Sequence, residues 1–227
     1  MSTKLKALSL GLLALLAMAA FGGVNTSAAI KGHFESEADH TVIVGTENGK
    51  KPHDLEFKEE GSAGAGITCT HAHYDGDIFA KTVTSVTVEP EYTKCGTTSD
   101  GIWGNVTVTT NGCAFVLYSH GANKHGTVDI ECPAGKTIEI HHPNCTITVP
   151  AQPATLGTLT GGLTYDTAVA VDGKHILTPT VTIQSITSHY HAGVCVFLGT
   201  PQAFEMNGSL TVEGFNTSGS RVNITHT

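Results

Sequence analysis

Apolar and polar residues alternate along most of this chain, and this period of two is the feature that most constrains its fold. In a β-strand successive side chains point to opposite faces, so each alternating run predicts a half-buried strand with threonine on its solvent face. The clearest runs are 105–109, 127–132, 137–141, 145–149 and 209–213. After residue 29 we find no convincing apolar stripe of helical period.

Asn-Gly and Asp-Gly pairs punctuate these runs, and such pairs tolerate the positive φ angles of tight hairpin turns. The six pairs are Asn48-Gly49, Asp75-Gly76, Asp100-Gly101, Asn111-Gly112, Asp172-Gly173 and Asn207-Gly208. Together with the alternation, they predict an all-β fold. We expect an antiparallel β-sandwich or a barrel-like sheet, possibly built as two packed β halves and stapled by disulfides.

The first 29 residues are typical of a secretory signal peptide. Lys4 and Lys6 precede the apolar run 7–24, and Ser27-Ala28-Ala29 supplies a small-residue cleavage site. An uncleaved membrane anchor is the alternative, because an apolar run of about 18 residues is at the lower limit for spanning a bilayer. We expect cleavage, a secreted or cell-surface protein, and no membrane span after the signal peptide is removed.

The remaining chain divides by composition into three segments. Residues 30–66 form an acidic N-terminal segment with one short strand at 41–44. Residues 67–150 form a β half that holds most of the cysteines. The prolines at 150 and 153 break the chain, and residues 151–227 form a second β half.

Charge excludes one class of partner. The chain carries 12 lysine and arginine residues against 20 acidic ones, for a net charge of -8, and Arg221 is its only arginine. Because neutralising nucleic-acid phosphates requires clustered lysine and arginine, we expect no nucleic-acid partner.

The six cysteines are even in number and all follow residue 29, which in an exported chain predicts three disulfides. If successive strands pair as a meander, the strand at 113–119 folds back on 126–132 and sets Cys113 opposite Cys132. The same reasoning separates Cys132 from Cys145 and pairs Cys95 with Cys145, which leaves Cys69 with Cys195. This set is one of 15 possible connectivities, and only its first pair is favoured over the alternatives.

The cysteine-centred motifs resemble those of secreted actinobacterial proteins of unknown function. The resemblance rests mainly on Asn111-Gly112-Cys113, on 128–136 (VDIECPAGK) and on 145–152 (CTITVPAQ), and it covers most of the chain after residue 29. It implies export and an all-β fold, but it supplies no activity and no catalytic residue.

Histidine provides the most unusual candidate chemistry. His71 and His73 form one pair at strand spacing, and His189 and His191 form another. Residues at i and i+2 share one face of a strand, with Cys69 in phase with the first pair. If Cys69 bonds Cys195, His73 falls near His191, and the imidazoles could then hold zinc, copper or nickel. The alternative is that all four are solvent-facing strand histidines.

Carboxylates at strand spacing offer a second possibility. Asp75 with Asp77, and Glu89 with Glu91, have the separation of a glycosidase acid–base pair, although any acidic strand meets that geometry. The Asp75-Gly76-Asp77 run is also the only hint of a calcium site, and it is short of the oxygens that an EF-hand requires.

Aromatic side chains suggest a third possibility, since sugar rings commonly stack on exposed aromatics. Trp103 is a candidate platform, although a core position is the more natural interpretation. Tyr74 follows His73, and Tyr190 lies between His189 and His191, so we expect a His/Tyr-rich surface at two matching sites.

These observations favour an exported, non-catalytic β module that binds an unknown extracellular ligand and requires no cofactor. A metal-binding protein that uses the four strand histidines is the first alternative. A secreted hydrolase is the second.

Overall fold

The computed structural model describes residues 32–47, 55–59, 66–97, 103–120, 125–143, 145–152, 162–193 and 203–227. The predicted signal peptide and the predicted turns at Asn48-Gly49 and Asp100-Gly101 lie outside these residues. Within the described ranges, no helix has the length and apolar character needed to cross a membrane.

The described chain consists of strands that pair antiparallel, which confirms the predicted all-β fold. Each of the five alternating runs that the sequence singled out matches a strand to within one residue at its ends. The strands are β1 (Phe34–Ser36), β2 (Thr41–Glu47), β3 (Leu55–Glu59), β4 (Ile67–Ile78), β5 (Thr82–Val83), β6 (Ser85–Thr97), β7 (Trp103–Thr109), β8 (Ala114–Ser119), β9 (His125–Glu131), β10 (Ile138–His142), β11 (Cys145–Val149), β12 (Gly162–Val169), β13 (His175–Thr187), β14 (His189–Gly193), β15 (Ala203–Phe215), β16 (Arg221–Val222) and β17 (Ile224–His226).

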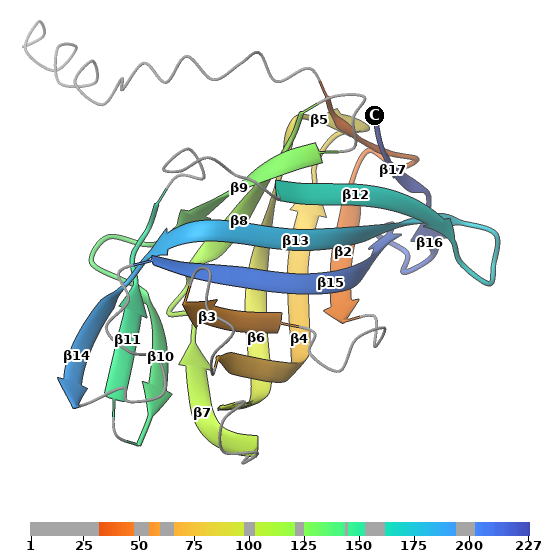
Figure 1. Cartoon of the computed structure of the whole chain (residues 1–227). Helices are drawn as coiled ribbons and strands as arrows, with labels where there is room; N and C mark the ends of the chain where they lie inside the picture. The colour runs from red at the N-terminus through yellow and green to blue at the C-terminus, as the bar shows by residue number, and fades with distance from the viewer. Residues whose placement is uncertain are drawn as a thin grey trace, which may run out of the picture.

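Eight of these strands close into a barrel. The hydrogen-bonded order runs β4-β6-β8-β9-β12-β13-β15-β2 and returns to β4, because β4 pairs with both β2 and β6. Figure 1 shows β12, β13 and β15 crossing in front of β2, β4 and β6. Both groups of strands contribute residues to the hydrophobic core, such as Val181 of β13 and Ile43 of β2. A closed eight-stranded sheet has an interior that side chains or one small ligand can fill.

Two long strands extend the sheet beyond the barrel. β6 pairs with β8 near its start and with β7 near its end, and β15 pairs with β3 at its start and with β2 farther along. From β7 the sheet continues through β10 and β11 to β14, which lie together at the lower left of Figure 1. The three segments predicted from composition therefore share one sheet. Residues 30–66 supply β2 and β3, and each of these strands pairs with β4 from residues 67–150 and with β15 from residues 151–227.

A small three-stranded sheet, which we call the cap, consists of β1, β5 and β17. It brings the start of the described chain against its end, since Phe34 pairs with His226 and Ser36 with Ile224. Phe34 and Ile224 are both buried, because the apolar face of the cap lies against the barrel core.

The disulfides partly follow the prediction. Cys113–Cys132 is confirmed, and it joins the ends of the adjacent strands β8 and β9. The predicted pairs Cys95–Cys145 and Cys69–Cys195 are wrong, because Cys69 is bonded to Cys95. The strand that contains Cys95 continues to Thr97 and pairs with β4 along its length, which sets the two cysteines directly opposite. Cys145 is also disulfide-bonded, and Cys195 lies outside the described residues.

The predicted turns also divide into two groups. Asn111-Gly112 and Asp172-Gly173 are confirmed as turns, with positive φ at Asn111, Gly112 and Gly173. Asp75-Gly76 and Asn207-Gly208 are not turns, because they lie inside β4 and β15. Gly76 serves close packing instead, since a Cβ atom there would lie 2.5 Å from the carbonyl oxygen of Thr87.

Candidate functional site

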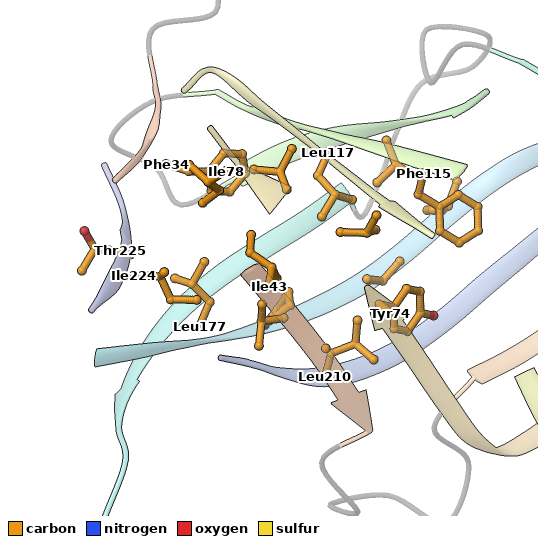
Figure 2. Close-up of a pocket in the computed structure, with 18 of the residues that line it drawn as sticks. Phe34, Ile43, Tyr74, Ile78, Phe115, Leu117, Leu177, Leu210, Ile224 and Thr225 are labelled. Atoms are coloured by element: carbon orange, nitrogen blue, oxygen red, sulfur yellow. The ribbon is translucent and has the colours of Figure 1, made fainter. Parts of the chain in front are cut away.

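The barrel encloses an apolar cavity of about 50 Å³, which we call the barrel cavity. Its walls come from strands all around the ring, as with Ile43 (β2), Val88 (β6), Val128 (β9), Val181 (β13) and Leu210 (β15). Figure 2 shows Ile43, Leu117, Leu177 and Leu210 pointing into the same space. Among the described lining residues, the side chains other than Tyr74 and Thr225 are apolar. Empty cavities in proteins are typically apolar in this way.

Strand alternation explains why these positions face inward. In β2 the buried positions alternate with exposed or half-buried ones, so Ile43 and Gly45 line the cavity while Val42 lies outside. Gly45 has a second role. A Cβ atom at this position would lie 3.1 Å from the Cβ of Tyr74, so glycine leaves room for the tyrosine ring.

A second cavity, of about 40 Å³, lies where the barrel passes into the β7-β10-β11-β14 extension. Its lining includes Cys69 (β4), Tyr92 (β6), Ile140 (β10) and Val149 (β11). Phe115 and Met206 line both cavities, and therefore form part of the wall between them.

Two buried tyrosines connect the cavities. Tyr74 lines the barrel cavity and Tyr92 lines the second one, and their hydroxyl oxygens are 3.2 Å apart. Their rings meet edge to face at 5.9 Å, and the Tyr74 ring lies 6.4 Å from that of Phe115. Burial raises the pKa of Tyr74 to about 12 and raises the pKa of Tyr92 well above its ordinary value. Both hydroxyls therefore stay protonated at neutral pH.

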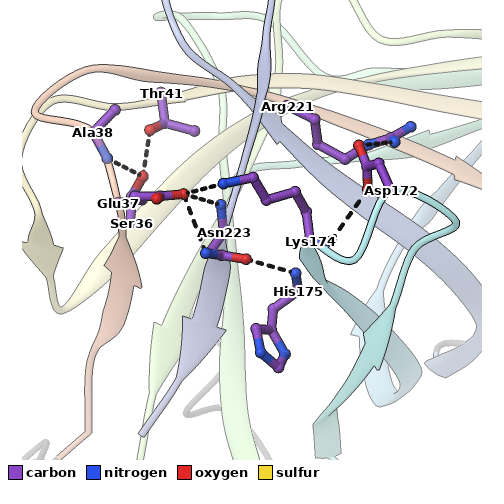
Figure 3. A network of polar contacts seen from close by, with 9 residues as sticks. All are labelled: Ser36, Glu37, Ala38, Thr41, Asp172, Lys174, His175, Arg221 and Asn223. Atoms are coloured by element: carbon purple, nitrogen blue, oxygen red, sulfur yellow. Dashed lines mark hydrogen bonds and ion pairs between the residues drawn. The ribbon is translucent and has the colours of Figure 1, made fainter.

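The cap closes the barrel cavity, since Phe34 of β1 and Ile224 of β17 are among its lining residues. Outside the cavity, the carboxylate of Glu37 accepts hydrogen bonds from Lys174 Nζ at 2.8 Å and from the backbone and side-chain nitrogens of Asn223 at 3.1 Å each. These contacts connect the end of β1 to the β12–β13 turn and to β17 (Figure 3). The hydrogen bond from Lys174, then that from Asn223, lowers the pKa of the Glu37 carboxyl.

A second set of polar contacts lies beside this one. Arg221 donates to Asp172 at 2.6 Å and its other terminal nitrogen lies 2.7 Å from Glu213. The hydrogen bond from Arg221 lowers the pKa of Asp172. Arg221 lies in β16, directly before β17 of the cap, and its contacts join this strand to the β12–β13 turn and to β15.

The structure does not bring the predicted histidine pairs together. His71 and His73 lie on β4, whose partners are β2, β3 and β6, whereas His189 and His191 lie on β14, which pairs with β11. Cys69 is buried while His71 is exposed, so the two are out of phase. Opposite this stretch of β4, Lys94 of β6 has a φ of 51°, which interrupts the regular alternation. Within the described part of the chain, no three His, Cys, Asp or Glu residues form a group suited to a metal ion.

The predicted carboxylate pairs lie on the outer face of the barrel. Asp75 is directly opposite Glu89, and His73 is opposite Glu91, across the β4–β6 pair. His73 Nε2 lies 3.1 Å from Asp75 Oδ1 and His40 Nε2 lies 2.8 Å from Asp77 Oδ1, so two of the predicted acids have a histidine partner. Asp75, Asp77 and Glu89 line one hollow of about 600 Å³ on this outer face, which is open to solvent.

Sequence reasoning missed the tyrosine pair. We predicted Tyr74 in a His/Tyr-rich surface, but it is 5% exposed and faces the interior, and Tyr190 packs against the core. The alternation of β4 contains the missing signal: since His71 and His73 face outward, Ala72 and Tyr74 must face inward. The side chain of Trp103, the other proposed aromatic platform, is outside the described residues.

Comparison with known proteins identifies no relative of this chain. A scan against protein-family models, a search of curated proteins and a search of solved structures each found no match to the chain.

Proposed function

We propose that this protein is exported to the cell surface or the surrounding medium, where its barrel binds a small apolar molecule without converting it. The observation that carries the proposal is the barrel cavity, an apolar space enclosed by eight strands and closed by the cap. Natural small-ligand sites are concave and lined mainly by apolar side chains. The outer histidine and carboxylate residues line two larger hollows, of about 300 and 600 Å³, which are more open to solvent than the barrel cavity.

Several features support the export part of the proposal. The described disulfides are of the kind that forms in oxidising compartments outside the cytosol. The signal-like N-terminus and the resemblance to secreted actinobacterial proteins point the same way.

The lining chemistry supports binding rather than catalysis. The polar side chains among the described lining residues of the barrel cavity are Tyr74 and Thr225. Neither the tyrosine hydroxyl, whose pKa burial raises to about 12, nor the threonine hydroxyl is a general base at neutral pH.

Xenon tests the proposal, because it is apolar, has no hydrogen-bonding group and is small enough for a cavity of about 50 Å³. At a free concentration ten times its Kd, ligand binding stabilises the folded protein by about 1.4 kcal/mol. For a chain of this size, that corresponds to a rise in Tm of roughly 3–6 °C. The oxidised, exported protein should show this rise in a thermal scan.

Matched variants locate the binding. Val181→Phe fills the barrel cavity and should abolish the xenon-induced rise, whereas Val171→Phe adds the same ring at a fully exposed turn position and should retain it. Absence of a rise in the unaltered protein, or an equal rise in both variants, would contradict the proposed function.

A further inference from the structure

An amine, a carboxylate and a carboxamide meet at the edge of the cap. Lys174 Nζ and Asn223 Nδ2 both donate to the same carboxylate oxygen of Glu37, at 2.8 and 3.1 Å. Figure 3 shows the two side chains pointing toward Glu37 from different elements, the β12–β13 turn and the start of β17. Because both nitrogens lie on one oxygen, the lysine amine and the asparagine carboxamide are neighbours across a single carboxylate.

The carboxamide of Asn223 is held at both of its polar atoms. Its Oδ1 accepts a hydrogen bond from the backbone N–H of His175 at 2.8 Å, while its Nδ2 donates to Glu37. A hydrogen bond donated to a carbonyl oxygen stabilises the negative charge that develops there when a nucleophile adds to the carbon. The asparagine is therefore oriented and polarised for attack at its side-chain carbon.

Lys174 and Glu37 have the properties of a nucleophile and a proton carrier. A lysine amine attacks in its neutral form, and an adjacent base assists the loss of its proton. The hydrogen bonds from Lys174 and Asn223 lower the pKa of the Glu37 carboxyl, so Glu37 is ionised at neutral pH and accepts a proton. The Lys174 and Glu37 side chains are 34% and 48% exposed. Solvent therefore keeps most of the amine protonated at neutral pH, and we expect a slow reaction.

We propose that Lys174 and Asn223 join through an intramolecular isopeptide bond, with Glu37 as the proton carrier. Lys174 Nζ forms a bond to Asn223 Cγ, and the bond from Cγ to Nδ2 breaks. Nδ2 leaves as ammonia, with the proton that Glu37 has moved from Nζ. One amide replaces another, so the step requires no oxidant, reductant or second substrate.

The bond fastens the cap to the barrel. Asn223 lies between β16 and β17, and Lys174 lies in the turn that leads into β13. The cross-link therefore ties the last strand of the chain to a barrel strand at a point where no described disulfide does so. Unlike a disulfide, an amide is not broken by reducing agents. This inference does not depend on what the barrel cavity binds.

Intact-mass spectrometry of the oxidised, exported protein tests the proposal, because bond formation removes one ammonia molecule from the chain. The protein is incubated at about pH 9, where a larger share of the lysine amine is neutral than at pH 7. The mass should fall by one ammonia. A tryptic digest should then contain one branched peptide that joins the segments around Lys174 and Asn223. A mass that stays unchanged, or a branch at other residues, would overturn the proposal.

Three variants assign the roles. Lys174→Arg keeps the positive charge beside Glu37 but removes the amine, and it should lose no ammonia. Glu37→Gln removes the proton carrier and should slow the loss about a hundredfold or more. Lys136→Arg makes the same exchange in the turn before β10, where its backbone N–H donates to Pro133, and it should react like the unaltered protein.

The lysine variant also separates the proposal from a side reaction. Asparagine loses ammonia without any lysine when it cyclises onto its own backbone. An equal loss of ammonia in Lys174→Arg and in the unaltered protein would therefore overturn the isopeptide bond. An equal rate in Glu37→Gln would overturn the role of the carboxylate.

Discussion

Removing the Cys69–Cys95 disulfide should destabilise the protein by an amount that its loop size predicts. The two cysteines are 26 residues apart in sequence. In the chain-entropy model, a cross-link that closes a loop of this length stabilises the fold by about 3.5 kcal/mol. Both side chains are also about 1% exposed, so a Cys69→Ala/Cys95→Ala variant loses buried sulfur atoms in addition. We therefore expect the free energy of unfolding to fall by at least ~3 kcal/mol.

Urea denaturation of the double variant measures this loss, with Cys113→Ala/Cys132→Ala as the comparison. The second bond joins residues 19 apart, and the same model gives about 3.2 kcal/mol. Thiol labelling then identifies the partner: the single variant Cys69→Ala should expose one reactive thiol, at Cys95. A loss below about 1 kcal/mol, or a label on Cys195 instead, would refute the reasoning.

Two other predictions concern packing and pH. Gly76→Ala should destabilise the β4–β6 pair by about 1–3 kcal/mol, since its Cβ would lie 2.5 Å from the carbonyl oxygen of Thr87, and urea denaturation measures this loss. Glu37 has a lowered pKa in the folded state, so its contribution is complete above its unfolded pKa and is lost as pH falls through the folded pKa. Thermal scans across the acid range should show a smaller pH dependence for Glu37→Gln, and an identical pH dependence would contradict the role of the Lys174 and Asn223 hydrogen bonds.

Local features of the fold were readable from the sequence because short-range chemistry controls them. The alternation of apolar residues with threonine on the solvent-exposed face indicated the strands. Asn111-Gly112 and Asp172-Gly173 indicated turns that the structure contains. The β8–β9 hairpin and the Cys113–Cys132 bond followed, since their partners lie close together along the chain. The same local rules failed at Asp75-Gly76, where glycine serves an approach between strands rather than a turn.

The proposed binding site illustrates the part that required the tertiary structure. A period of two shows that a strand has two faces, but it does not show which face the ring encloses. That choice depends on the pairing of distant strands, such as β15 with β2 and β4 with β6. For this reason the sequence analysis placed Tyr74 with the histidines on a surface and did not single out Tyr92.

By itself, the sequence determined an antiparallel all-β chain with a local disulfide and a signal-like N-terminus, because these depend on residue type and near neighbours. Only the tertiary structure decided that eight strands close into a ring, that Cys69 meets Cys95, and that two tyrosines meet between two apolar cavities. Strand pairing over long separations joins residues with no sequence signal of their partnership, and the barrel interior exists only once that pairing is complete.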